Sequence, residues 1–338
     1  MATIAILGAG DMGTALCTPA AANGHDVRLW GTHLDREIVA ALRAGQPHPR
    51  LGVPVPDGVS VFRDDEEEGA IGAADVVLFA ISSVGVRAIA ARFASWLPRV
   101  PLVMTVAKGF DPDPAGGPPL LLTDVIAERT GSPIVGVGGP SKANEVARGV
   151  PTAVVYAGDG AAPAEAAALF RYDTYRVETS GDLVGVEIAA AMKNAYAIAL
   201  AVADGLELAT GAPHHNLRAA LFPRAVAEMG RFAAALGGRA ETVAGLAGAG
   251  DLQVTITSGR NRLLGERVGA GEPGPDAVRS LREAGITIEG YDALGFGRGL
   301  AATLCDATGE PLQLPLLDAL WRVLHLGDPP LETLWSAV

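Results

Sequence analysis

The feature that most constrains this chain is a glycine turn placed between two apolar strands close to the N-terminus. Residues 3 to 7 (TIAIL) are apolar and partly β-branched, GAGDMG follows them, and residues 25 to 31 (HDVRLWG) supply a second strand after a helical segment. In this order Gly8 permits a tight turn, Gly10 lets the backbone approach a pyrophosphate, and Gly13 lets the helix pack against the sheet. The pattern predicts a dinucleotide site, with a structural glycine turn of another α/β protein as the alternative.

The rest of the chain divides into a strand-rich and a helical part. Buried-type strands are expected at residues 75–82, 101–108, 133–139 and 151–158, with helical or polar connections between them. Such alternation favours a parallel sheet covered on both faces. After about residue 180 the chain has alanine- and leucine-rich helical segments and no convincing strand. We therefore predict an α/β fold with a Rossmann-type parallel sheet domain at 1–180 and an all-helical domain at 181–338.

Charge and composition narrow the classes of ligand. Hydrophobic residues make up 49% and charged residues 19% of the chain, which is typical of a compact globular protein. The net charge of −12 gives no long-range attraction for a polyanion, so nucleic acid is not expected as a partner. An anionic ligand would need local basic groups. The acidic run at residues 64–68 is interpreted as a solvated loop.

Cysteine, histidine and hydropathy patterns predict a cytoplasmic protein without a metal site. Cys17 and Cys305 show no metal or redox spacing, and two distant cysteines suggest a reducing compartment. The six histidines also lack a ligand pattern. The N-terminus has no basic region typical of a signal peptide, and no apolar run is expected to span a membrane.

The end of the second strand bears on the choice of cofactor. A site specific for NAD usually has an acidic residue there, which binds the ribose 2′-hydroxyl. Here the chain reads Trp30, Gly31, Thr32 and His33 without a carboxylate. We therefore expect NADP as cofactor, with NAD also accepted, and Thr32, His33 and Arg36 as contacts of the 2′-phosphate.

Lysine is rare in this chain, which makes its three positions candidates for chemistry. Of 26 basic residues only Lys108, Lys142 and Lys193 are lysines. Lysine can pass a proton when it is desolvated, whereas arginine stays charged. On a helix over residues 184–203, the neighbours of Lys193 on its own face are not acidic. Lys193 therefore either extends to solvent or meets a partner from another segment, and the adjacent Asn194 favours an oxygen-bearing ligand.

Two further segments carry polar groups suited to a ligand. Lys108 ends a predicted strand, at the carboxyl edge where open α/β sheets bind ligands. In GAGDLQVTITSGRNR, Asp251 and Thr255 precede Arg260 and Asn261 at a predicted helix start. Arginine beside backbone donors at a helix start suits a phosphate. A solvated basic turn is the alternative.

Together these segments resemble the NAD(P)-dependent sn-glycerol-3-phosphate dehydrogenase family. The resemblance covers nearly the whole chain in order: GAGDMGTAL, NGHDVRLWG, HPRLGVPVPDGV, AKGF, GGPSKANEVARGVPTAV, AMKNAYAIA, GAGDL, SGRNR and IEGYDAL. It implies an enzyme that reduces dihydroxyacetone phosphate to sn-glycerol 3-phosphate, and the reverse, and that supplies glycerophosphate for phospholipid synthesis. A homodimer and a small phosphorylated substrate are also implied.

The resemblance assigns roles to individual residues. Lys193 would donate and accept the proton at the substrate C2 oxygen, with Lys108 and Asp251 as further catalytic groups. The implied substrate contacts are Lys108, Gly139, Ser141, Lys193, Asn194, Asp251, Thr255, Arg260 and Asn261. The implied cofactor contacts are Gly8, Gly10, Asp11, Met12, Gly13, Thr32, His33, Lys108, Ala143, Arg260 and Glu289.

Two positions depart from the family pattern, and two other functions compete. Asn144 stands where the family often has a basic residue, and Gly259 replaces a frequent serine. A two-domain dehydrogenase of β-hydroxyacids or ketopantoate would also combine a glycine turn with a helical lysine and asparagine. That alternative would not require SGRNR together with Lys108. A dinucleotide-sensing regulator without catalysis is the second alternative.

Overall fold

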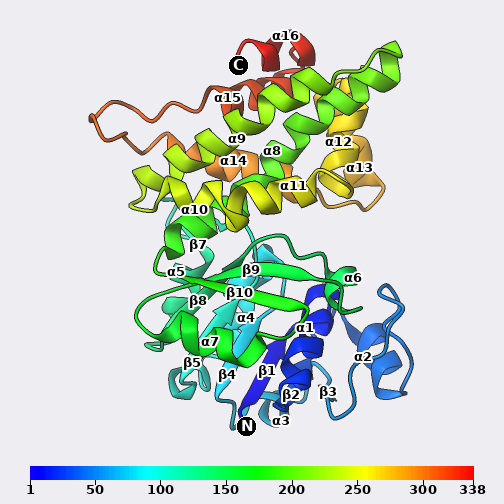
Figure 1. Cartoon of the computed structure of the whole chain (residues 1–338), viewed down its shortest axis with the longest axis vertical. Coiled ribbons are helices and arrows are strands. Elements are labelled where there is room, and N and C mark those ends of the chain that lie inside the picture. The colour runs from blue at the N-terminus through cyan, green and yellow to red at the C-terminus, as the bar shows by residue number, and fades with distance from the viewer. The chain divides into compact units, whose positions relative to one another are not determined.

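The computed structural model describes all 338 residues, and the chain forms two compact units (Figure 1). The first unit contains residues 1–111 and 120–183, and the second contains residues 112–119 and 184–338. The division into two domains at residues 180 and 181 stays a prediction. The two units are described in turn below.

The first unit is built on an eight-stranded sheet in the order β10-β9-β8-β5-β4-β1-β2-β3. Its strands are β1 (Thr3–Leu7), β2 (Asp26–Trp30), β3 (Ser60–Phe62), β4 (Val76–Phe79), β5 (Leu102–Thr105), β8 (Ile134–Gly138), β9 (Thr152–Ala157) and β10 (Tyr175–Ser180). A separate antiparallel pair consists of β6 (Phe110–Asp111) and β7 (Leu120–Leu121). Each of the six strands expected from the sequence is present. The additional strands β3 and β10 were not expected, because β3 has three residues and β10 alternates apolar with polar positions.

The predicted parallel sheet is confirmed with one exception. Neighbouring strands pair in parallel throughout the sheet, except that β8 and β9 pair antiparallel. The chain passes from β8 to β9 through α6 (Ala143–Val146) and a short loop. Parallel crossovers usually contain a longer helix, whereas this connection, residues 139–151, holds only the four-residue α6, so an antiparallel pair fits it.

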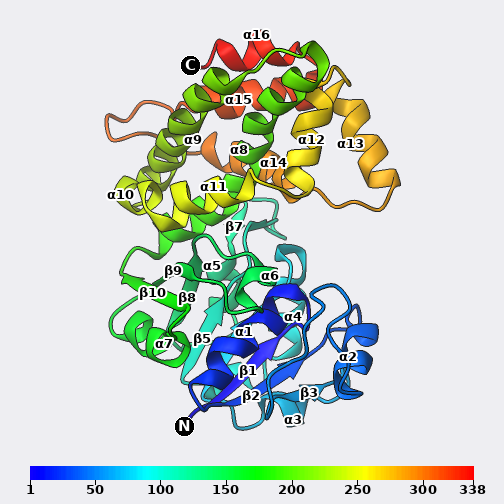
Figure 2. The same ribbon diagram turned by 45° about the vertical axis from the view of Figure 1, so that its right-hand side comes forward.

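Helices cover both faces of the sheet (Figure 2). Alternate strand residues point to opposite faces: Ile4 and Ile6 of β1 belong to one apolar core, and Ala5 and Leu7 belong to the other. The first core includes residues of α1 (Asp11–Ala22), α2 (Arg36–Arg43) and α7 (Ala162–Phe170), and the second those of α3 (Glu67–Ile71), α4 (Val86–Arg92) and α5 (Leu122–Ala127). Short 3₁₀ turns lie at Ser83–Gly85 and Leu97–Arg99.

The second unit is helical, as expected, and contains no strand. Its helices are α8 (Leu183–Thr210), α9 (His215–Ala235), α10 (Ala240–Ala244), α11 (Asp251–Thr255), α12 (Arg260–Gly269), α13 (Gly274–Glu283), α14 (Glu289–Ala301), α15 (Pro315–Trp321) and α16 (Pro330–Trp335). Two π-helical segments occur, at Leu246–Gly250 and Arg322–Leu326.

The core of the second unit is α8, which is longer than the helix expected at 184–203. By length and composition it could cross a membrane, which corrects the expectation that no apolar run reaches that length. Its most apolar 18-residue window has a mean hydropathy of 1.4, and 94% of that window is buried inside the protein. Such burial is what the core helix of a globular unit shows. Figure 2 shows α8 between α9 and α12.

Glycines bring α12 and α14 close to α8. A Cβ added at Gly265 or Gly269 of α12 would overlap a backbone carbonyl oxygen of α8, and so would a Cβ at Gly290 of α14. At Gly297 of α14 it would overlap the Met192 sulfur. These contacts fix how far α12 and α14 lie from residues 192–202 of α8.

A buried carboxylate also ties three helices of this unit together. Glu228 of α9 accepts hydrogen bonds from the Tyr196 hydroxyl of α8 at 2.9 Å and from the backbone of Leu316 and Leu317 at 2.7 and 3.0 Å. The last two donors are free N–H groups of the first turn of α15, which a carboxylate satisfies well. Burial raises the pKa of Glu228.

We predict that Gly265→Ala lowers the free energy of unfolding by about 1–3 kcal/mol, because the added methyl group would force α12 away from α8. Gly295→Ala is the matched control, since this glycine is also helical and has no atom within 4 Å of an added Cβ. The control should be neutral or more stable by up to about 1 kcal/mol, because alanine favours the helix. Urea denaturation of both variants tests this, and equal stabilities would contradict the packing argument.

Candidate functional site

The glycine turn of the first unit leaves its backbone open on one side. Gly8 has φ +113°, and a Cβ there would lie 2.5 Å from the Ala80 carbonyl oxygen. A Cβ on Gly13 would overlap the Gly8 carbonyl, so α1 packs against the strand as the spacing predicts. Gly10 has only the Arg50 guanidinium near its missing side chain, at 4.0 Å. The turn at Gly10 therefore has room for a ligand beside the N-terminus of α1, where backbone N–H groups favour an anion.

Arg50 is a further residue of this site, which its sequence pattern does not indicate. Arg50 Nε donates to the Asp11 carboxylate at 2.7 Å, and the same carboxylate lies 3.7 Å from Nε2 of the buried His48. Backbone N–H groups of Arg50 and Leu51 donate to His48 Nδ1, each at 3.2 Å. His48 thus fixes the loop that carries a guanidinium to the glycine turn. In the sequence, the HPRLG segment of this loop is part of the family resemblance, but the resemblance implies no role for it.

A cavity of about 210 Å³ extends from the glycine turn past the end of β2. Its lining comes from the glycine turn, the β2–α2 loop and the segment after β4: Gly8, Gly10, Thr32, His33, Leu34, Asp35, Ala80, Ile81, Ser82, Gly85, Ala88 and Ile89. The exposed side chain of Leu34 is one of the apolar groups of this lining. Its polar groups and apolar surface together suit the adenosine half of a dinucleotide.

Residues 30–33 hold no carboxylate, as the sequence shows, but Asp35 brings one to the same place. Asp35 returns its carboxylate to Thr32, where it accepts from the backbone N–H at 2.9 Å and from Oγ1 at 2.8 Å. Asp35 is therefore an acidic group on the cavity wall, but Thr32 already occupies one of its oxygens. The position of this carboxylate is not evident from the sequence, because it depends on the chain turning back after β2.

The carboxyl edge of the sheet carries four of the other predicted site residues. Lys108 follows β5, while Gly139, Ser141 and Ala143 follow β8, which pairs in parallel with β5. Gly139 has φ +118°, and a Cβ there would lie 3.0 Å from Val154 Cα. Ser141 Oγ donates to the Gly139 carbonyl at 3.3 Å. Since these segments end neighbouring parallel strands, they share the edge where open α/β sheets bind ligands.

The acidic run is a solvated loop only in part: Asp64, Asp65 and Glu66 lie in a turn, with Asp65 70% exposed, but the run continues into a helix and its carboxylates are paired. Residues 67–71 form α3, and each of the five carboxylates has a partner. The pairs are Asp64 with Arg36, Asp65 with Arg63, Glu66 with Arg43 and Arg63, Glu67 with Arg92, and Glu68 with Trp96 Nε1. The run therefore neutralises arginines that other segments of the first unit bring to it.

In the second unit Lys193 is buried and paired. It is only 6% exposed, so the alternative in which it extends to solvent is wrong. Its ammonium group donates to the carboxylate of Asp251, which is 1% exposed, and to Thr255 Oγ1 at 2.9 Å. The partner comes from another segment, as the lack of acidic neighbours on its own helix required. Because the charge of Lys193 is balanced, it can stay in the apolar surroundings of α8.

The local backbone explains how Asp251 and Thr255 reach the same ammonium group. They are four residues apart on α11, so they lie on one face of that helix. The GAG segment before Asp251 is π-helical, and a Cβ on Gly248 would overlap the Val243 carbonyl oxygen. Glycine therefore permits the tight backbone that presents Asp251. Short π-helical segments are frequent at functional sites.

A second polar group of the same unit lies around Glu289 at the start of α14. Its carboxylate accepts from Arg260 Nη2 at 3.0 Å and, weakly, from Asn194 Nδ2 at 3.4 Å. Asn261 accepts from the Gly290 backbone at 2.9 Å. The side chains of Arg260 and Glu289 are about half exposed, at 52% and 45%. The starts of α12 and α14 thus place a guanidinium near the residue that follows Lys193.

The two groups of the second unit differ in what they can do chemically. The ammonium of Lys193 is enclosed and held by two oxygens, an arrangement that suits controlled proton transfer. Arg260 is accessible and lies at the first position of α12, an arrangement that suits an anion. The structure contains no cluster of three or more His, Cys, Asp or Glu side chains that could hold a metal ion.

Comparison with known proteins agrees with this arrangement. Two family models match, the N-terminal part of NAD-dependent glycerol-3-phosphate dehydrogenase over residues 3–163 and its C-terminal part over residues 182–334. An NADP(+)-dependent glycerol-3-phosphate dehydrogenase of Archaeoglobus fulgidus is 36% identical, with 98% of each chain covered. A glycerol-3-phosphate dehydrogenase [NAD(P)+] of Halorhodospira halophila is 37% identical, with 98% of this chain and 94% of the relative covered.

A solved structure is similar over the same length. The crystal structure of a glycerol-3-phosphate dehydrogenase from Coxiella burnetii has a TM-score of 0.82 and 30% identity, covering 99% of this chain and 98% of that one. Sequence and fold thus match over the sheet unit and the helical unit together. With the dinucleotide turn in one unit and the buried lysine in the other, the chain belongs to the NAD-dependent glycerol-3-phosphate dehydrogenase family.

Proposed function

We propose that this enzyme reduces dihydroxyacetone phosphate to sn-glycerol 3-phosphate, and catalyses the reverse reaction, with NADP(H) as preferred and NAD(H) as accepted cofactor. The observation that carries the proposal is the buried ammonium of Lys193, held by Asp251 and Thr255 in the same unit as Arg260 and Asn261. A phosphorylated ketone needs both a proton donor and a phosphate contact, and this unit offers both.

The first unit fits a dinucleotide. The open backbone at Gly10 and the N-terminus of α1 suit a pyrophosphate, and the cavity beside Thr32 suits the adenosine. When bound, the cofactor supplies or takes up a hydride at the substrate C2. Lys108 and Ser141, at the carboxyl edge of the sheet, are proposed to orient the reacting groups.

Lys193 is the proposed proton donor for reduction. As a hydride adds to C2, the carbonyl π electrons move to the oxygen, which takes a proton from the ammonium group and becomes the hydroxyl. Lys193 is left as a neutral amine next to the Asp251 carboxylate, and a proton from solvent restores the ammonium group. In oxidation the neutral amine takes the hydroxyl proton. Asp251 and Thr255 keep the amine in one position throughout, which preserves its orientation.

Arg260 and Asn261 are the proposed contacts of the substrate phosphate. The guanidinium is half exposed and can form two parallel hydrogen bonds to phosphate oxygens. A phosphate remote from C2 is bound in the ground and transition states alike, so it fixes the position of the reacting carbon. Glu289, which holds Arg260 in this structure, is proposed to keep the guanidinium oriented.

Three parts of the proposal concern the setting of the enzyme. We propose that it supplies glycerophosphate for phospholipid synthesis, that it is cytoplasmic, and that it forms a homodimer. These rest on the resemblance of the chain to its family and on its two distant cysteines, both of which are free thiols.

The proposed substrate can be tested against the alternatives. In a panel of phosphorylated and carboxylated ketones with NADPH, we expect the highest kcat/KM with dihydroxyacetone phosphate. A β-hydroxyacid or ketopantoate-type dehydrogenase would instead prefer a keto acid, and a non-catalytic sensor would turn over none of them. A higher kcat/KM with any carboxylated ketone would contradict the proposal.

We predict that Lys193→Met lowers kcat by about 10²–10⁴-fold, which is the usual contribution of a positioned general acid. NADPH binding, measured by fluorescence titration, should be retained because the glycine turn belongs to the first unit. Lys193→Met leaves the Asp251 carboxylate buried without its cation, so the double variant Lys193→Met/Asp251→Asn serves as a stability control. Near-parent kcat in either variant would remove Lys193 from the chemistry and leave Lys108 as the candidate.

We predict that Arg260→Ala raises KM for dihydroxyacetone phosphate by at least about tenfold, with a smaller effect on kcat, because uniform binding is lost. Arg279→Ala removes the same charge from α13, where Arg279 pairs only with Asp276 near its own turn, and should leave both constants unchanged. Steady-state kinetics distinguish the variants. A collapse of kcat at constant KM would place Arg260 in the chemical step.

A further inference from the structure

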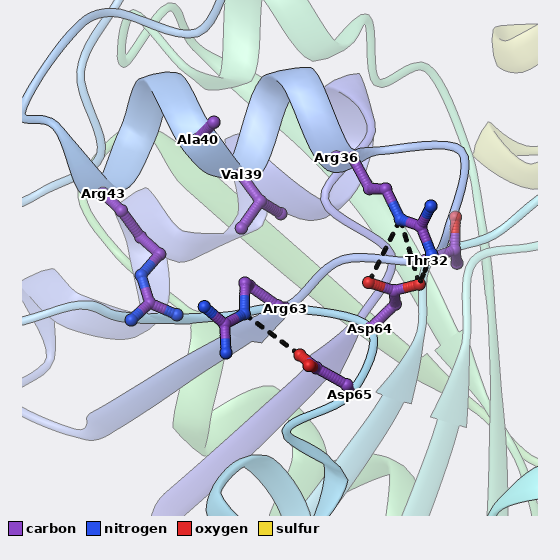
Figure 3. A pocket seen from close by; sticks show the side chains of 8 residues that line it. All are labelled: Thr32, Arg36, Val39, Ala40, Arg43, Arg63, Asp64 and Asp65. Carbon is purple, nitrogen blue, oxygen red and sulfur yellow. Dashed lines mark hydrogen bonds and ion pairs between the residues drawn. The ribbon is translucent and has the colours of Figure 1, made fainter.

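A second cavity shares Thr32 with the adenosine cavity, and Figure 3 shows the residues that line it. It has a volume of about 510 Å³ and is lined by three arginines, Arg36 and Arg43 of α2 and Arg63 after β3. Thr32 lines both cavities. An anionic group attached to a ligand at Thr32 could therefore meet the arginines of this second cavity.

Each of these arginines already has a carboxylate partner. Arg36 is held by both oxygens of Asp64, with Nε at 3.4 and 3.2 Å and Nη2 at 2.7 Å. Arg63 pairs with Asp65 at 3.0 Å, and Arg43 pairs with Glu66. Figure 3 shows Asp64 directly below Arg36, with Asp65 turned toward Arg63. An incoming anion would have to share or displace these carboxylates.

Asp64 is the more firmly placed partner of the pair with Arg36. Its side chain is 15% exposed, whereas that of Arg36 is 72% exposed. The Arg92 guanidinium donates to the Asp64 backbone carbonyl, which anchors the main chain there. The hydrogen bond from Arg36 holds the pKa of the Asp64 carboxyl below its usual value, so the carboxylate is charged at neutral pH. A mostly covered carboxylate thus faces an exposed guanidinium.

We propose that Asp64 is a specificity-determining residue, which competes with the 2′-phosphate of NADP(H) for Arg36 and so limits the preference for NADP(H) over NAD(H). The proposal rests on the proposed use of both cofactors. A 2′-phosphate must draw Arg36 away from Asp64 and bind close to a carboxylate of the same sign. NAD(H) has a hydroxyl at this position and requires neither step. Asp64 therefore acts selectively against the phosphorylated cofactor.

Asp64→Asn tests the proposal, with Asp65→Asn as its matched control. Both variants remove one negative charge from the same segment, but Asp65 is 70% exposed and pairs with Arg63. We expect Asp64→Asn to raise the NADPH to NADH ratio of kcat/KM about three- to tenfold, in line with the strength of exposed ion pairs and nearby like charges. Asp65→Asn should change the ratio less than twofold. Equal ratios in the two variants would overturn the proposal.

Arg36 must be the group through which Asp64 acts. In the double variant Arg36→Ala/Asp64→Asn, we expect the gain in the NADPH to NADH ratio to disappear. If the gain persisted without Arg36, it would reflect the loss of net charge alone, and the proposed competition would be wrong.

Direct binding separates this inference from the proposed function. Calorimetry with 2′,5′-ADP and 5′-AMP needs no turnover, and Asp64→Asn should bind 2′,5′-ADP about three- to tenfold more tightly with unchanged binding of 5′-AMP. If the parent binds 2′,5′-ADP and Asp64→Asn binds it no more tightly, the inference fails while the function stands. If no variant binds either nucleotide or oxidises NADPH, the proposed function fails and the inference fails with it.

Discussion

The buried charge of Lys193 constrains the second unit more than any other interaction. An ammonium group inside an apolar helix is tolerated only with a partner of opposite charge, because an unpaired buried charge is very costly. Asp251 is equally buried and supplies that charge, with Thr255 as a second acceptor. The position of α11 against α8 and the π-helical segment before Asp251 both follow from this pair. Since such pairs seldom add net stability relative to apolar residues, their presence is better explained by chemistry.

Small residues then bring the remaining polar groups to the same part of α8. Gly265 and Gly269 let α12 approach the carbonyls of α8, and Gly290 does the same for the start of α14. Arg260, Asn261 and Glu289 occupy the first turns of these two helices, so their positions are set by backbone contact. Side chains on rigid elements hold their geometry better than those on loops. Glycine spacing in this unit therefore serves the site as well as the packing.

Features that depend on neighbouring residues could be predicted from the sequence. Features that depend on contacts between distant segments could not. Apolar runs identified six strands of the sheet, and the lack of acidic neighbours on its own helix indicated that Lys193 needed a distant partner. The antiparallel β8–β9 pair goes with a connection that holds only the four-residue α6, and the return of Asp35 to Thr32 depends on a turn after β2. Neither has a pattern in the chain. The run at 64–68 looked solvated because most of its arginine partners lie on the distant helices α2 and α4.

The net charge of −12 has a consequence for a chain proposed to bind two anions. The accessible arginines at both candidate anion sites carry an internal carboxylate, Asp64 on Arg36 and Glu289 on Arg260. An anion at either site must share the arginine with this carboxylate or replace it, so affinity depends on how the two partners compare. This competition gives selectivity among anions. An anion binds well only if its charge and geometry suit the guanidinium better than the carboxylate does. Lys193 differs, since its carboxylate partner Asp251 is buried with it, and we propose that this pair serves proton transfer and not the binding of an anion.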